Sequence, residues 1–212
     1  MLRILKSILR EVQQIVRTAR MKQQGTRQAK QLADGGEELW LDLGCGPIKR
    51  PGFVGIDLSL HADIQWDIRW GLPFNDNSVI EIRSDHFLEH LELPLVVKVL
   101  RECQRVLVSG GTLDFTVPHL DPYLDAYSRR DFDFLQEKIF DVPPRQEYLY
   151  NTCFDRIAWL LHRAGEHKSL FDRDSIVAKL RVAGFTDVAT REFDPDRDTS
   201  QRFSSIYVVA IK

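Results

Sequence analysis

Cysteine is scarce in this sequence, and long apolar runs are missing. The 212 residues include three cysteines, Cys45, Cys103 and Cys153, which lie far apart and form no C-x-x-C pair. This odd, widely spaced set indicates neither a disulfide framework nor a zinc module. No apolar run approaches the ~18 residues that a membrane-spanning helix needs. We therefore expect a protein of a reducing, cytoplasmic compartment.

Internal repeats and low-complexity tracts are missing as well. Hydrophobic residues make up 43% of the chain and charged residues 28%. These ordinary globular values exclude a disordered, collagen-like or coiled-coil chain. The length fits one α/β domain with a terminal extension.

Charge is unevenly distributed, although the net charge is only -2. Residues 1–33 contain eight Lys/Arg and one acidic residue, Glu11, for a balance of +7. The rest of the chain then holds 21 of the 29 basic and 30 of the 31 acidic residues, a balance of -9. Nucleic-acid binding is driven largely by Lys and Arg that neutralise phosphates. We therefore expect no nucleic-acid partner for the acidic body.

The first twenty residues carry apolar side chains at helical spacing, with Arg and Lys between them. The apolar positions are Leu2, Leu5, Ile8, Leu9, Val12, Ile15 and Val16. This pattern predicts a basic amphipathic helix. Its apolar stripe is expected to pack on the body or on a second copy of the chain, or to lie peripherally on an anionic membrane. Residues 22–37 are polar, include Gly35-Gly36 and predict a linker or a frayed helix end. Residues 1–37 thus form an N-terminal segment.

Short strands alternate with helices in residues 38–212. The strand candidates are residues 39–43, 53–57, 62–67, 79–83, 112–117 and 204–211. A helix is predicted from Pro94, ending at Gly110-Gly111, and another over residues 175–183 with Gly184 as its cap. This alternation predicts an α/β fold with a doubly wound, mostly parallel sheet. The aromatic-rich residues 123–170 predict a helical insertion.

An apolar strand runs directly into a glycine turn at residues 39–47, Leu-Trp-Leu-Asp-Leu-Gly-Cys-Gly-Pro. Glycines there let backbone N–H groups approach a ligand at the carboxyl edge of a sheet. The turn alone is weak support, because a tight turn can be purely structural. A dinucleotide fingerprint starting at Gly44 would need glycine where Lys49 stands, and a P-loop would need G-K-[ST]. Hydride and phosphoryl transfer are therefore disfavoured.

Acidic residues end the next two apolar runs. Asp57 ends the second predicted strand, where a carboxylate commonly accepts the hydroxyls of a ribose. Asp67 ends the third, just before Gly71-Leu72-Pro73-Phe74. Together with Asp42 of the first strand, these acids are expected to converge on one edge of the sheet.

These stretches together resemble the class I S-adenosylmethionine-dependent methyltransferases, in particular their small-molecule, type 11-like branch. The similar motifs are L-D-L-G-C-G-P at 41–47, G-I-D at 55–57 and L-P-F-N-D-N-S at 72–78. The similarity covers residues 39–117, and a weaker similarity is found at residues 183–185 and in the last strand. It implies a seven-stranded sheet with an antiparallel last strand and S-adenosyl-L-methionine (SAM) as the cofactor.

The resemblance also implies residue roles at this edge. Asp42 and Gly44-Cys45-Gly46 would hold the methionyl part of SAM, Asp57 the ribose hydroxyls, and Asp67 with Ile68 the adenine. The chain departs from the family pattern at residues 45–52, since these eight residues join two strands whose crossover usually takes a dozen or more. We therefore predict a shortened first crossover. Ile48 also stands where family members often have a third glycine.

Methyl transfer requires a positioned nucleophile and, for a hydroxyl acceptor, a base. This chemistry needs no metal, and we expect none. The candidate bases follow the fourth and fifth strands: His86, His90 and His119. Each of them could instead be structural or a binding contact. His167, just before the late helix, could reach the same pocket.

The residues favour a SAM-dependent methyltransferase that acts on a small-molecule acceptor. O-methylation of a sugar or glycan precursor is the more specific expectation. The alternative is a catalytically inactive methyltransferase-like binding or scaffold protein docked on a membrane or partner. The shortened crossover and the basic helix are the features that favour this alternative.

Overall fold

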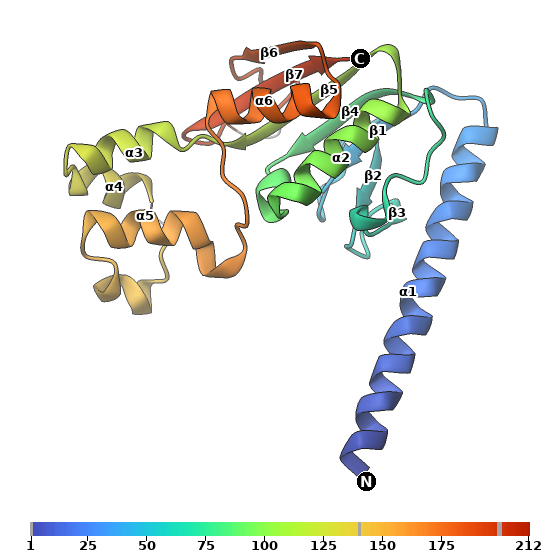
Figure 1. The fold of residues 1–212 in the computed structure, drawn as a ribbon, viewed down its shortest axis with the longest axis horizontal. Coiled ribbons are helices and arrows are strands. Elements are labelled where there is room, and N and C mark those ends of the chain that lie inside the picture. The colour runs from blue at the N-terminus through green and yellow to red at the C-terminus, as the bar shows by residue number, and fades with distance from the viewer. Residues whose placement is uncertain (1, 140, 199–200) are drawn as a thin grey trace.

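A computed structural model describes residues 2–139, 141–198 and 201–212 and contains one seven-stranded sheet. The strand order is β3-β2-β1-β4-β5-β7-β6 (Figure 1). Strands β1 to β5 pair in parallel, and β7 is antiparallel to both β5 and β6. This confirms the predicted doubly wound fold. The strands are β1 (Trp40–Leu43), β2 (Val54–Asp57), β3 (Ile64–Gln65), β4 (Val79–Asp85), β5 (Leu107–Pro118), β6 (Asp187–Arg191) and β7 (Ser205–Ile211).

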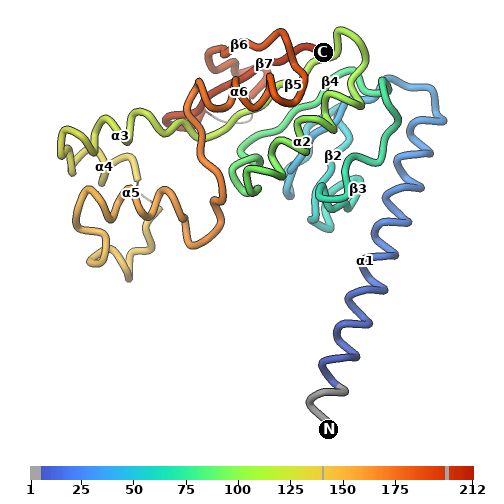
Figure 2. The backbone as a smooth tube through the Cα atoms, viewed as in Figure 1, coloured from blue at the N-terminus to red at the C-terminus, as the bar shows by residue number. Residues whose placement is uncertain are grey.

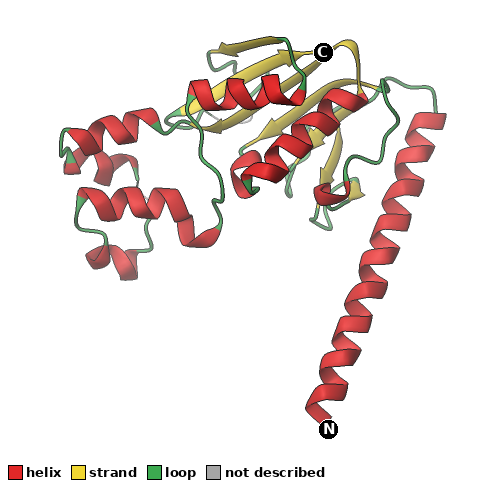
Figure 3. Cartoon of the chain, in the orientation of Figure 1, coloured by secondary structure: helices red, strands yellow, loops and turns green. Residues whose placement is uncertain are grey.

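Helices α2 (Leu93–Val106) and α6 (Arg173–Ala183) lie across one face of the sheet (Figure 3). Their apolar sides bury Val99 and Leu180, among others, against the inner strand residues. Pro94 occupies the first turn of α2, where its missing N–H costs nothing. Gly184 caps α6 at a φ of +106°, as predicted. The main apolar core therefore lies between these helices and the sheet.

The predicted end of the α2 helix is wrong. The helix stops at Val106, and β5 begins at the next residue. Gly110 and Gly111 lie inside β5 instead, close to a register shift in its pairing with β4. A Cβ on Gly111 would meet the carbonyl oxygen of Val108 at 2.9 Å, so this glycine allows a close backbone approach within the strand.

The first crossover is short, as predicted. Residues 44–53, all described, form turns and no helix. The Gly44 N–H donates to the carbonyl oxygen of Ile56 at 2.9 Å, and the Gly46 N–H donates to the Asp57 carboxylate at 3.1 Å. These two hydrogen bonds join the glycine turn directly to β2. They hold the connection between β1 and β2 in place without a crossover helix.

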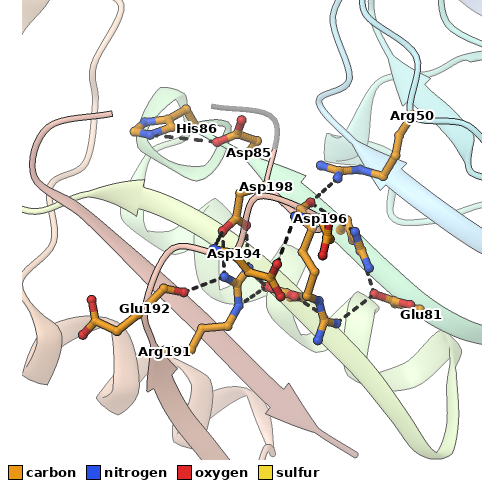
Figure 4. Close-up of polar contacts among 12 residues, drawn as sticks. Arg50, Glu81, Asp85, His86, Arg191, Glu192, Asp194, Asp196 and Asp198 are labelled. Atoms are coloured by element: carbon orange, nitrogen blue, oxygen red, sulfur yellow. Dashed lines mark hydrogen bonds and ion pairs between the residues drawn. The ribbon is translucent and has the colours of Figure 1, made fainter. Parts of the chain in front are cut away.

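The face of the sheet opposite α2 and α6 carries charges. Side chains alternate along a strand, so Asp114 points away from the core neighbour Phe115. Asp114 is 3% exposed and accepts from Arg191 at 2.7 Å. Arg191 also binds Asp198 at 2.6 Å, and Arg197 lies 3.2 Å from Asp114 (Figure 4). Ion pairs thus hold the β6–β7 connection over this face.

The segment between β5 and α6 forms a helical lobe beyond the carboxyl end of β5 (Figure 1). It contains α3 (Asp121–Ser128), α4 (Phe132–Lys138), α5 (Cys153–His162) and the 3₁₀ helices η3 (Pro144–Leu149) and η4 (Arg163–Gly165). The lobe has its own apolar cluster, which includes Leu135, Ile157 and Trp159. Arg156 lies inside this cluster and donates to the carbonyl oxygen of Ile139 at 3.2 Å. A separately packed lobe therefore stands beside the strand ends.

Helix α1 (Leu2–Asp34) projects away from the body (Figures 1 and 2). It continues through residues 22–34, where the sequence predicts a linker or a frayed end. Ala29 is buried there, and a Cβ on Gly25 would lie 2.6 Å from the Trp66 ring. Lys22 lies 5.6 Å from the centre of the Trp70 ring. Gly25 and Ala29 are small enough to let the C-terminal half of α1 pack closely on the body. This packing, together with the contact between Lys22 and Trp70, keeps residues 22–34 helical.

The N-terminal half of α1 exposes an apolar stripe. Its residues, between 42% and 67% exposed, are Ile8, Leu9, Val12, Ile15 and Val16. The side chains of Leu2 and Leu5, also part of the predicted stripe, lie outside the described residues. Among the described helices, none combines the length and the apolarity needed to cross a bilayer.

Candidate functional site

A cavity of about 500 Å³ opens at the carboxyl ends of β1 and β2 and beside η1 (Ile68–Trp70). We call it the first cavity. Five of the predicted site residues line it: Gly44, Asp57, Asp67, Ile68 and His90. Apolar side chains such as Leu43, Ile56, Phe87 and Leu91 form most of the remaining wall. The structure thus brings the ends of successive strands around one apolar pocket.

Asp57 is held by backbone donors at the mouth of the first cavity. One carboxylate oxygen accepts from the Gly46 N–H at 3.1 Å, and the other accepts from the Ser59 N–H at 2.7 Å. Each carboxylate oxygen has two acceptor positions. Asp57 is therefore fixed in direction and still able to accept hydrogen bonds from two hydroxyls.

Asp67 caps η1 and is bound to a neighbouring guanidinium. Its carboxylate accepts from the backbone N–H of Arg69 at 3.0 Å and from the Arg69 Nε at 2.9 Å. The hydrogen bond from the Arg69 side chain holds the pKa of Asp67 below its usual range. Asp67 is therefore an anion at neutral pH in the wall beside Ile68.

Gly44 adopts a conformation and a contact that a side chain would disturb. Its φ is +69°, and a Cβ there would lie 2.4 Å from the Phe87 ring. Gly46 also has a positive φ, of +58°, yet a Cβ on it would meet nothing within 4 Å. A side chain at residue 44 would therefore meet both an unfavourable backbone conformation and a clash, whereas a side chain at residue 46 would meet only the unfavourable backbone conformation.

A second cavity, of about 650 Å³, lies on the other side of Gly44. Asp42 and Cys45 line it together with Gly44. Burial raises the pKa of Asp42 to about 6, and Arg50, whose Nε lies 3.8 Å from the carboxylate, opposes this effect. A buried carboxylate with a raised pKa gains from a nearby cation. Four carboxylates and five Lys or Arg side chains line this cavity, so it offers charges of both signs to a ligand.

A third cavity, of about 580 Å³, lies between the ends of β4 and β5 and the helical lobe. His86 and His119 line it at the sheet side. Aromatic side chains and several cations line the remainder: Tyr123, Phe203, Lys138, Arg163 and Arg202, against a single carboxylate from Asp141. This cavity is therefore suited to an anionic molecule with a ring.

His86 has the geometry of an oriented base. Its Nδ1 lies 3.0 Å from the buried Glu89 carboxylate, and its Nε2 lies 3.1 Å from the Ser205 hydroxyl. Figure 4 shows its contact with Asp85, at 3.9 Å. The carboxylate accepts, so Nδ1 donates and Nε2 is left as the acceptor. His86 also has a φ of +50°, a backbone strain found mostly at functional sites.

Of the other two predicted bases, His119 shares the third cavity with His86, and His90 does not. His90 lines the first cavity, and its ring centre lies 5.4 Å from that of His167. His119 lies at the rim of the third cavity, where Asp121, an exposed residue, holds its Nε2 at 2.9 Å. The structure therefore does not gather the three histidines at one point.

Glu89 and His167 are not among the residues that sequence reasoning selects for catalysis. Glu89 is 1% exposed, and His167 is 7% exposed, so that burial lowers its pKa. A local signal exists for Glu89, which follows His86 by three residues. The position of His167 before the late helix predicts that it can reach the pocket, but its contact with this cluster depends on backbone bonds from Lys168 and Ser169 to the Glu89 carbonyl oxygen.

Comparison with known proteins bears on the fold. No protein-family model and no curated protein sequence matches the chain. A SAM-dependent methyltransferase from Methanosarcina mazei superposes with a TM-score of 0.52 and 18% identity, covering 83% of this chain and 92% of that one. This chain has the class I methyltransferase fold.

Two further solved structures with lower scores are methyltransferases as well. A SAM-dependent methyltransferase from Thermotoga maritima gives a TM-score of 0.46 at 15% identity, covering 100% of both chains. A phosphoethanolamine N-methyltransferase from Haemonchus contortus, solved with SAM, gives 0.46 at 14% identity, covering 88% of this chain and 52% of that one.

The cavities of this methyltransferase fold adjoin one another. The first and second share Gly44, and the first and third meet where His90 contacts His167. The first and second cavities thus lie side by side along the strand ends, and the third adjoins the first beside His90 and His167. This arrangement can hold two molecules end to end.

Proposed function

We propose that the protein transfers a methyl group from SAM to a small-molecule acceptor. The observation that carries the proposal is the shared position of Asp57 and Asp67 on one apolar cavity that Gly44 joins to the second cavity, which is lined by charged side chains of both signs. SAM is a nucleoside joined to an amino acid through a sulfonium, and its two halves match these two cavities.

The residues then divide by the part of SAM that they would bind. Asp57 would accept the ribose hydroxyls, and Asp67 with Ile68 would bound the adenine. Asp42 and the Gly44-Cys45-Gly46 turn would hold the methionyl end, with the Asp42 carboxylate facing its ammonium. A bound ammonium would oppose the effect of burial, lower the pKa of Asp42 and favour its ionised form.

The acceptor would occupy the third cavity. We propose a hydroxylated, anionic small molecule such as a phosphorylated sugar or glycan precursor, methylated on oxygen. Tyr123 and Phe203 offer ring faces, and their rings pack edge to face at 5.9 Å. Lys138 and Arg163 line the same chamber and favour an anion. His86, oriented by Glu89, would remove the hydroxyl proton.

Calorimetry with SAM tests the cofactor assignment. We expect Asp57→Ala to weaken SAM binding by about 10- to 100-fold, because hydrogen bonds to a charged group contribute about 1.5–3 kcal/mol. Asp187→Ala, a change at an exposed carboxylate of the edge strand β6, should leave the affinity unchanged. The absence of binding heat with folded wild-type protein would reject the proposal. SAM binding without transfer to any acceptor would favour the scaffold alternative.

We propose further that the N-terminal half of α1 lies on an anionic membrane surface. Five exposed apolar residues share one side of this half of the helix. Among the described side chains of this half, Glu11 is acidic and the other charged side chains are basic. Lys6, Arg10, Arg17 and Arg20 flank the stripe. A second copy would bring like charges together, whereas anionic lipids complement them. Charge therefore favours the membrane over self-association.

Sedimentation with vesicles tests this peripheral contact. The full chain should bind vesicles that contain phosphatidylserine and should bind neutral phosphatidylcholine vesicles much less. Ile8→Asp with Ile15→Asp should abolish binding, because the charges interrupt the stripe. Arg27→Glu with Lys30→Glu, in the half of α1 near the body, serves as the control. Vesicle binding unchanged by the first pair, or a stable dimer lost with it, would contradict the proposal.

A further inference from the structure

Three side chains with metal-binding atoms meet where the first and third cavities adjoin. Glu89 and His90 belong to the 3₁₀ helix η2 (Leu88–His90), and His167 precedes α6. One ligand atom from each residue lies within 4.8 Å of the other two. Zn²⁺ holds N and O ligands tetrahedrally at about 2.0–2.2 Å, so its ligand atoms lie about 3.3–3.6 Å apart. The three side chains would therefore have to move closer together when they bind the ion.

Glu89 has an oxygen without a partner. The residue is 1% exposed, and its Oε1 is engaged by His86 Nδ1 at 3.0 Å. Its Oε2 is buried and has no hydrogen-bond partner among the described residues. A buried polar atom left without a partner costs free energy, and a bound ion is one way in which proteins satisfy such an atom. A bound cation would satisfy this oxygen.

Both imidazole rings are oriented for coordination. His90 Nδ1 lies 3.1 Å from the Glu166 carbonyl oxygen, and His167 Nδ1 lies 3.2 Å from the Leu160 carbonyl oxygen. A carbonyl can only accept, so both Nδ1 atoms carry the proton and both Nε2 atoms keep a lone pair. Metal-binding histidines usually donate their second ring N–H to such a group.

The backbone fixes His167 beside η2. The N–H groups of Lys168 and Ser169 donate to the Glu89 carbonyl oxygen at 2.8 Å and 3.1 Å. The Ser169 hydroxyl also donates to the Leu91 carbonyl oxygen at 2.6 Å. Three hydrogen bonds therefore hold segments that are distant in sequence in a fixed relation. A ligand set needs this kind of support to be selective.

We infer that Glu89, His90 and His167 bind a divalent transition-metal cation. Two imidazole nitrogens and one carboxylate favour Zn²⁺, Fe²⁺, Co²⁺ or Mn²⁺ over the oxygen-seeking Mg²⁺ and Ca²⁺. Three protein ligands leave positions open for a further ligand. The sequence analysis expects no metal, because methyl transfer needs none, and this inference departs from that expectation.

The open positions border the chamber assigned to the acceptor. A role in holding the acceptor hydroxyl beside His86 rests on the proposed function, whereas the metal site itself does not. Glu89 joins the two, since one of its oxygens contacts His86 and the other is buried without a hydrogen-bond partner among the described residues. Metal binding should therefore be measured in the absence of SAM and acceptor.

Cobalt titration of the full chain tests the site. After chelator treatment and dialysis, wild-type protein should bind one Co²⁺ per chain, seen as visible d–d absorption and by calorimetry, and Zn²⁺ should displace it. His90→Ala and His167→Gln should each weaken binding at least about 10- to 100-fold, the loss typical of even an outer partner of a metal ligand. His61→Ala and His162→Ala, at exposed histidines outside the cluster, should bind as wild type does.

Circular dichroism of each variant separates ligand loss from unfolding, and His90→Ala changes a residue that is only half-buried. The inference is overturned if folded wild-type protein binds no stoichiometric Co²⁺, or if folded His90→Ala binds it unchanged. Calorimetry with SAM on the metal-free protein keeps the two proposals apart. SAM binding without a metal site rejects only this inference, and a metal site without SAM binding rejects only the proposed methyl transfer.

Discussion

Gly44→Ala is expected to lower the free energy of unfolding by about 2–5 kcal/mol. A left-handed backbone costs an L-residue about 1–2 kcal/mol, and the φ of Gly44 is +69°. The new Cβ would also lie 2.4 Å from the Phe87 ring, and overpacking of this kind costs about 1–3 kcal/mol. Urea denaturation followed by circular dichroism measures the loss.

Gly46→Ala is the matched control. Its φ of +58° imposes the same backbone cost, but its Cβ would meet nothing within 4 Å. We expect a loss of only about 1–2 kcal/mol. The difference between the two variants isolates the contact with Phe87, which lines the first cavity. Equal losses would show that this contact does not restrict residue 44.

His86→Asn is expected to lower kcat by about 10²- to 10⁴-fold, the usual contribution of a general base. Asparagine tolerates the left-handed backbone at this position better than most residues, so the fold should be retained. SAM affinity should not change, because His86 lines the third cavity and not the first. The measurement is transfer of labelled methyl groups, after a screen that compares phosphorylated with neutral sugars has identified an acceptor.

His119→Asn provides the comparison for this assignment. Its ring lies at the rim and pairs with the exposed Asp121, so we expect kcat to fall less than tenfold. A large loss in this variant together with an unchanged kcat in His86→Asn would assign the proton transfer to the other histidine. The contact between His86 and Glu89 would then have an orienting role only.

The doubly wound, mostly parallel sheet could be predicted from the sequence because local signals agree with the tertiary fold. Asp57 ends its strand at the predicted residue, and Gly184 caps α6 as expected. Strand β6 gives no such signal of its own. It has an exposed or half-exposed residue at every position and lies at the edge of the sheet, so no clear apolar alternation marks it.

The parts of the site that could not be predicted depend on contacts between distant segments. His167 reaches Glu89 only through the backbone pairing of Lys168 and Ser169, and no periodicity encodes that pairing. The length of α1 is a second case. Gly25 weakens a helix when considered alone, yet the space it leaves is filled by Trp66. Tertiary packing overrides the local preference there.

Trp66 stands between α1 and the first cavity. It lies beneath Gly25 on one side, lines the cavity on another, and is fixed by its indole N–H, which donates to the Gly71 carbonyl oxygen at 2.6 Å. Trp66, together with the hydrogen bond from the Gln28 side chain to the Asp63 carbonyl oxygen at 3.0 Å, thus joins α1 to the wall of the cavity. Any surface on which α1 rests therefore determines the height and the tilt of the cavity opening above it.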